Sequence, residues 1–172
     1  MNPLESWSHA VTDIPAGGLT RTRKASEEDC TSLTTALAIP AVERLDVNYR
    51  ISTLPGGGYR LSGDLSGQVV QACIVTLEPV PGAVKDTFDV EFWLDFARRA
   101  AEAEQSVLSG PDVEPLAHGV IDAGRIVFEC LSAALDPYPR KHGAEFGWRD
   151  PVQEKAGDSS PFVILAKLKG GK

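Results

Sequence analysis

The chain has 172 residues, the length of one ordinary domain, and its 42% hydrophobic and 24% charged residues are typical of a folded globular protein. These values exclude a wholly disordered chain, a collagen-like chain and a membrane-spanning chain. The net charge is -7, and the acid is concentrated in residues 61–137, which carry 4 basic and 13 acidic residues, against 7 and 4 in residues 138–172. An acidic middle repels phosphate backbones, so a nucleic-acid contact would have to use the ends of the chain.

The thiols and the start of the sequence indicate a cytoplasmic protein. Cys30, Cys73 and Cys130 are odd in number, far apart and without a C-x-x-C pair, so we expect no disulfide. The first residues, MNPLESWSHA, have neither the basic nor the apolar region of a signal peptide. We therefore expect no membrane and no DNA among its partners.

The first elements expected along the chain are a hairpin and a helix. Trp7–Ile14 and Leu19–Lys24 read as extended pieces around the turn residues Pro15-Ala16-Gly17-Gly18. Ser26 followed by three acids is typical of a helix start, and the apolar spacing of Cys30, Leu33 and Leu37 predicts a helix over residues 26–38.

Residues 43–93 predict an antiparallel meander. Apolar and polar residues alternate over 43–54, 59–65 and 84–93, and residues 68–77 are apolar on both faces, as in a central strand. Gly- and Pro-rich turns at 55–58 and 79–82 separate these runs. The sheet is expected to be open or barrel-like.

The second half predicts one strong helix and a tail. Leu94–Val107 is helix-prone, Ser109–Leu116 reads as a loop, and Asp122 is expected to cap a helix that ends near Leu135. Residues 140–160 are polar and aperiodic, followed by a short amphipathic run, Pro161–Leu168. The fold class is therefore α+β, with one domain over residues 1–139 and a flexible basic tail over 140–172.

Chemical motifs are sparse. His9, His118 and His142 lie in different segments without ligand spacing, so we expect no metal, and the Gly56–Gly58 run joins two strands instead of opening a helix, so we expect no phosphate cradle. We expect no cofactor and no catalytic residue. The alternative is a small-molecule-binding or hydrolytic domain, for which Cys73, His118 and Asp122 are the one conceivable polar cluster.

Three unbroken strings carry a family resemblance: VVQACIVTLEPV (69–80), IDAGRIVFE (121–129) continuing through DPYPRK (136–141), and SPFVILAKLK (160–169). Together with the helix over residues 25–39, they resemble the YceD family, the large ribosomal RNA subunit accumulation proteins, in its alphaproteobacterial form. The resemblance implies a non-enzymatic cytoplasmic factor needed for 23S ribosomal RNA accumulation and large-subunit biogenesis. Many members have a second cysteine three residues after the position of Cys73 and a C-terminal cysteine cluster. Here Thr76 and Arg140-Lys141-His142-Gly143 stand at these places, so the implied zinc is not carried over.

Two modes of action fit these properties. The acidic body could bind a basic ribosomal protein or assembly factor, which we favour, or the basic C-terminal third could contact 23S ribosomal RNA. The amphipathic run could fold on a partner or pack back on its own sheet. The candidate partner-binding residues are Arg140, Lys141, Phe162, Leu165, Lys167, Leu168 and Lys169.

Overall fold

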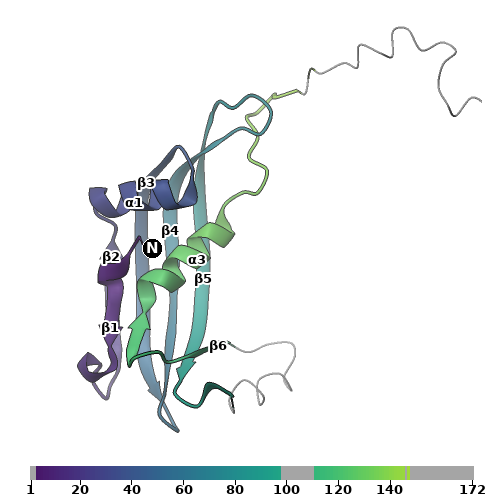
Figure 1. The fold of residues 1–172 in the computed structure, drawn as a ribbon. Helices are drawn as coiled ribbons and strands as arrows, with labels where there is room; N and C mark the ends of the chain where they lie inside the picture. Colours follow the sequence, from purple (N-terminus) through teal and green to yellow (C-terminus); the bar gives the residue numbers. More distant parts are fainter. Residues whose placement is uncertain (1–2, 98–110, 146, 148–172) are drawn as a thin grey trace, which may run out of the picture. The chain divides into compact units, whose positions relative to one another are not determined.

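The computed structural model describes residues 3–97, 111–145 and 147, and residues up to His142 belong to one compact unit (Figure 1). Its strands are β1 (Ser8–Ala10), β2 (Leu19–Lys24), β3 (Ala41–Leu54), β4 (Gly58–Ala72), β5 (Pro79–Trp93), β6 (Asp112–Pro115) and β7 (Val120–Asp122). Its helices are the 3-10 turns η1 (Glu5–Trp7) and η2 (Val11–Asp13) and the α-helices α1 (Glu27–Leu37) and α3 (Ala123–Ala134).

The main sheet has the order β2-β3-β4-β5-β6, and β1 pairs with β7 in a separate ribbon. The pairs from β2 to β5 are antiparallel, with one register shift between Val42 and Arg44 of β3, and they place Tyr49 opposite Gly63 and Gly63 opposite Phe88. The α+β class and the antiparallel meander are therefore confirmed. The sheet is open between its edge strands β2 and β6, so it does not form a barrel.

Both predicted α-helices form where their caps were expected. Ser26 Oγ accepts a hydrogen bond from Asp29 N at 3.1 Å, and Asp29 Oδ2 accepts one from Ser26 N at 2.9 Å. This reciprocal pair satisfies backbone donors at the start of α1. Asp122 Oδ1 accepts a hydrogen bond from Arg125 N at 3.0 Å and caps α3 with this single bond.

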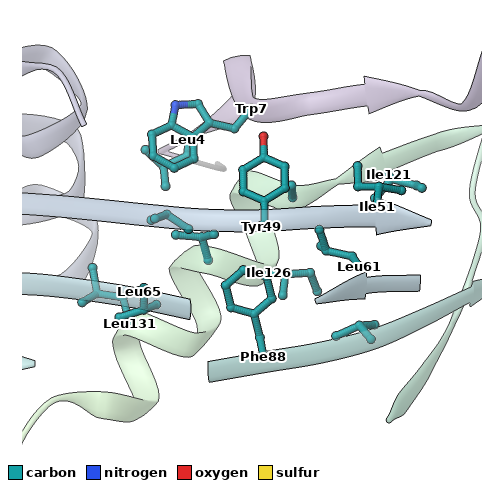
Figure 2. Packing of buried hydrophobic residues seen from close by; sticks show 14 of the residues in the cluster. Leu4, Trp7, Tyr49, Ile51, Leu61, Leu65, Phe88, Ile121, Ile126 and Leu131 are labelled. Carbon is teal, nitrogen blue, oxygen red and sulfur yellow. The ribbon is translucent and has the colours of Figure 1, made fainter. Parts of the chain in front are cut away.

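The core lies between one face of the sheet and the helices (Figure 2). The inward positions of β3, β4 and β5 supply Val47, Tyr49, Ile51, Leu61, Leu65 and Phe88, while α1 supplies Leu33 and α3 supplies Ile126 and Leu131. Leu4 and Trp7 close the cluster from the N-terminal segment. Alternation places the polar residues of these strands on the opposite face, where Asn48 meets Asp64 and Arg60 forms an ion pair with Asp89.

Several sequence predictions are wrong in detail. The N-terminal hairpin does not form, because β1 pairs with β7 and β2 pairs with β3. Residues 112–115, predicted as loop, form β6, which pairs with β5 in parallel. The run 59–65 and residues 68–72 form one strand, β4, which ends at Ala72, so Cys73 lies in the following turn instead of inside a strand. Most of the helix-prone segment 94–107 lies outside the described residues.

Candidate partner-binding surfaces

Two segments far apart in sequence meet at the end of β4, and we call this place the Cys73 corner: the turn Cys73–Glu78 and the segment 136–142. Ile74 N donates a hydrogen bond to Pro139 O at 2.9 Å, and Gln71 Nε2 donates one to Asp136 O at 2.9 Å. Lys141 Nζ forms an ion pair with Glu78 Oε1 at 2.8 Å. The corner therefore joins the first two of the three strings that carry the family resemblance.

The Cys73 corner exposes large apolar side chains. Leu77 is 79% exposed, Tyr138 is 71% exposed and Ile74 is 45% exposed. Leu77 also has a left-handed φ of 61°, a conformation that is uncommon for leucine, and its N–H is fixed by a hydrogen bond to Cys73 O at 2.9 Å. The turn is thus held by backbone hydrogen bonds while its apolar side chains face solvent.

The sulfur of Cys73 lies beneath this surface. The residue is fully buried, and its Sγ accepts hydrogen bonds from Lys141 N at 3.4 Å and from Thr76 N at 3.5 Å. The Lys141 backbone N–H, followed by the hydrogen bonds from Thr76, lowers the pKa of the Cys73 thiol to about 6 against the opposing effect of burial. The hydrogen bonds that join the two segments of the corner therefore favour the thiolate form of Cys73.

This pKa makes the stability of the protein depend on pH through Cys73. The folded pKa of about 6 lies below the unfolded value near 9, so the unfolded state binds the proton more tightly. The contribution of the thiolate is complete above pH 9 and is lost as the pH falls to about 6. We expect Cys73→Ser to lower the free energy of unfolding by an amount that grows from pH 6 to pH 9, measured by urea unfolding of both proteins across this range.

Cys130 provides the matched control. Burial, together with Asp86, raises the pKa of the Cys130 thiol to about 12, so this thiol stays protonated in the folded state between pH 6 and pH 9. The difference between Cys130→Ser and the unsubstituted protein should not increase over that range. A Cys73→Ser effect that is flat with pH would show that the Cys73 thiol is neutral.

A second concave surface, the α1 groove, lies between α1, the N-terminal segment around η1 and Phe128 of α3, and has a volume of about 1020 Å³. Glu5, Glu28 and Asp29 line it, and among the described residues no lysine or arginine lines it. The groove is therefore acidic, with the aromatic ring of Phe128 as an apolar contact.

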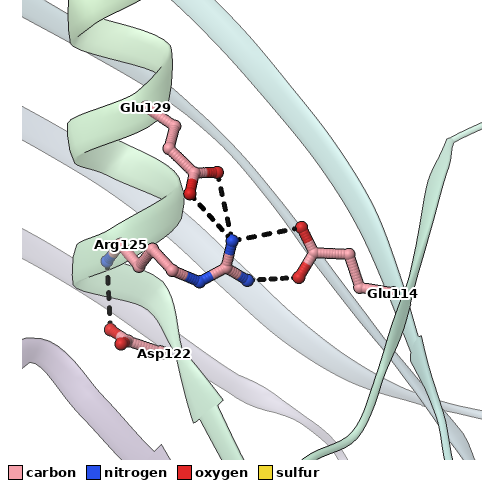
Figure 3. Close-up of polar contacts among 4 residues, drawn as sticks. All are labelled: Glu114, Asp122, Arg125 and Glu129. Carbon is pink, nitrogen blue, oxygen red and sulfur yellow. Dashed lines mark hydrogen bonds and ion pairs between the residues drawn. The ribbon is translucent and has the colours of Figure 1, made fainter.

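Arg125 fixes the edge of the sheet to α3 (Figure 3). Its guanidinium forms an ion pair with Glu114 of β6, and its Nη1 lies 2.9 Å from Glu129 Oε1, one helical turn along α3. These partners raise the pKa of Arg125, with the hydrogen bond to Glu114 as the main cause. Both acids are occupied by Arg125, so this cluster is a structural tie between β6 and α3.

The three residues of the enzymatic alternative do not come together. Cys73 contacts the segment that follows the C-terminal end of α3, whereas Asp122 caps the N-terminal end of this 12-residue helix, which is about 18 Å long. His118 is exposed in the turn before β7. Cys73 is also buried with backbone donors around its sulfur, so the alternative has no shared site for its residues.

The predicted partner-binding residues fall into two groups. Arg140 and Lys141 lie at the Cys73 corner and are exposed. Phe162, Leu165, Lys167, Leu168 and Lys169 lie outside the described residues, as does most of the predicted tail, so their role stays a prediction. Sequence reasoning missed Leu77 and Tyr138, and it missed Leu77 because the apolar run 68–77 predicts a strand instead of a turn.

A zinc site does not fit the residues of the Cys73 corner. Thr76 stands where a second thiolate would be needed, and Lys141 contributes a backbone N–H to the sulfur. Among the residues that the structure describes, no three histidine, cysteine or acidic side chains are grouped to hold a metal ion. None of the described helices is long and apolar enough to cross a membrane.

Comparisons with protein-family models, with curated proteins and with solved structures found no match to this chain.

Proposed function

We propose that the protein is a non-enzymatic factor that supports 23S ribosomal RNA accumulation and large ribosomal subunit biogenesis by binding a ribosomal protein or an assembly factor. The pathway comes from the resemblance of the three strings to the YceD family. The proposed mode of action is binding through the Cys73 corner, because two of these strings meet there and expose Ile74, Leu77 and Tyr138.

The corner has the properties of a preformed binding surface. A backbone that is already fixed adds little ordering cost on binding, and each exposed apolar side chain contributes buried apolar area to a complex. Leu77 adds a second argument, since its left-handed backbone is costly and its exposed side chain returns little burial in the free protein. Binding to a partner would recover that burial.

A protein partner suits this surface better than RNA does. RNA binding normally depends on clustered cations, and here the charge of Lys141 is balanced by Glu78. Ile74 and Leu77 are aliphatic, so they gain from contact with apolar side chains and not from phosphates. The exposed cation of Arg140 and the exposed ring of Tyr138 favour RNA as the second candidate.

The test is complementation of a deletion strain of the source organism. Loss of the protein should lower 23S relative to 16S ribosomal RNA, and a variant with Leu77→Ser and Tyr138→Ser should fail to restore the ratio. Both side chains are exposed, so the variant should melt like the unsubstituted protein. Loss of about 1.5–3 kcal/mol per buried apolar side chain weakens binding by about tenfold or more for each residue.

Leu94→Ser is the matched control, because Leu94 is 75% exposed and lies at the opposite end of β5 from the Cys73 corner. It should complement fully. An unchanged 23S to 16S ratio in the deletion strain would refute the pathway, whereas full complementation by the double variant would remove the Cys73 corner from the function.

A further inference from the structure

We propose that the α1 groove is the docking site for a lysine- or arginine-rich segment of the protein partner. This inference rests on the proposed function, and it takes up the expectation from the sequence that the acidic body binds a basic protein. It names a second surface, formed by α1, η1 and Phe128, that no part of the family resemblance assigns.

The charges that line the groove are available for a partner. Asp29 is engaged in the cap of α1, but the carboxylates of Glu5 and Glu28 form no ion pair with any residue that the structure describes. Because no lysine or arginine of the described part of the chain lines the groove, both carboxylates favour a partner that brings its own positive charge.

The remainder of the lining favours a peptide segment over a free cation. Thr31 Oγ1 donates to Glu27 O at 2.8 Å, and Thr35 Oγ1 donates to Thr31 O at 3.0 Å, so these hydroxyl protons are used within α1. Their methyl groups and the ring of Phe128 are left as apolar contacts. A volume of about 1020 Å³ is at the upper end of the range for small-molecule pockets and can hold several side chains.

The combination of acids and apolar contacts suits an amphipathic basic segment. Lysine and arginine side chains have long apolar stems that can lie on Phe128 and the threonine methyl groups while their charged ends reach Glu5 and Glu28. A single-stranded RNA is disfavoured at the same place, since its phosphates would approach three carboxylates.

The experiment measures binding of a fluorescent lysine–leucine peptide by anisotropy, beside a peptide with glutamate for every lysine and a single-stranded RNA of similar length. Of the three probes, we expect only the basic peptide to bind, and we expect its affinity to fall as the salt concentration is raised. A variant with Glu5→Lys and Glu28→Lys should bind it at least about tenfold more weakly, because two attractive contacts become repulsive.

The matched control carries Glu27→Lys and Glu43→Lys. It has the same change in net charge, and Glu27 shares the first turn of α1 with Glu28, but neither residue lines the groove. This variant should bind nearly as well as the unsubstituted protein, and NMR shift changes on adding the peptide should centre on α1 and Phe128. Equal losses in the two variants, or shift changes elsewhere, would overturn the docking site.

These outcomes are separate from those of the functional test. Peptide binding in the purified protein does not depend on the 23S to 16S ratio, so the proposed function can fail while the α1 groove still binds. Conversely, if the 23S to 16S ratio falls in the deletion strain but the peptide does not bind, the docking site in the α1 groove is refuted and the proposed function is not.

Discussion

Replacing Gly63 with alanine is expected to lower the free energy of unfolding by about 2–3 kcal/mol. Gly63 lies in the central strand β4, between Tyr49 of β3 and Phe88 of β5. A Cβ at this position would lie 2.8 Å from the Phe88 ring and 2.8 Å from Tyr49 Cβ, and it would also clash with the carbonyl oxygen of Asn48. The backbone of β3 cannot move away without breaking its ladder, so the strain falls on the core.

Urea unfolding of Gly63→Ala measures this loss, with Gly82→Ala as its control. Gly82 lies in β5, and a Cβ there would meet no atom within 4 Å. The control should be neutral or slightly stabilising, because alanine restricts the unfolded chain. Equal stability of the two variants would show that Tyr49 and Phe88 do not pack closely against Gly63.

Replacing Gly124 with alanine is expected to destabilise the protein by about 1–3 kcal/mol, the reverse of the usual effect inside a helix. Alanine normally favours an α-helix by about 1 kcal/mol over glycine. Here a Cβ would lie 2.9 Å from Leu4 Cβ and would clash with the Leu4 carbonyl oxygen. The N-terminal segment that contributes Leu4 and Trp7 to the core would have to move off α3.

Ser132→Ala is the control on the same helix, since Ser132 is exposed and alanine has the higher helix propensity. It should raise the melting temperature slightly while Gly124→Ala lowers it. A Gly124→Ala protein that melts higher than the unsubstituted one would mean that Leu4 does not approach α3. The presence of a glycine at position 124, in the string IDAGRIVFE, would then need another explanation than the close approach of Leu4.

The predictable part of the fold consists of long elements with a clear period. Residues 43–54 and 84–93 alternate over many positions, and the helices of Ser26 and Asp122 combine a cap with an apolar stripe, so local sequence determines them. The short strands β1, β6 and β7 have three or four residues each, too few for a period. Their pairing depends on partners distant in the chain, which a local pattern does not encode.

The same distinction applies to the candidate surfaces. Arg140 and Lys141 could be named because basic residues are visible in the sequence. The Cys73 corner could not be predicted from the sequence, because Cys73 and Lys141 are 68 positions apart and meet only when α3 lies across the sheet. The sequence placed Cys73 inside a strand, since residues 68–77 are apolar on both faces, and that interpretation hid the turn that exposes Leu77.

The edge strand β2 has a consequence for how copies of the protein meet. Its sequence, LTRTRK, places Arg21, Arg23 and Lys24 along the outer strand of the sheet. If two copies joined antiparallel through β2 around Thr22, Arg21 of each would lie opposite Arg23 of the other. Like charges at that spacing repel, and natural sheets use such residues to prevent strand-to-strand aggregation. The protein can therefore present apolar residues at the Cys73 corner while its long open sheet is kept from extending into a polymer.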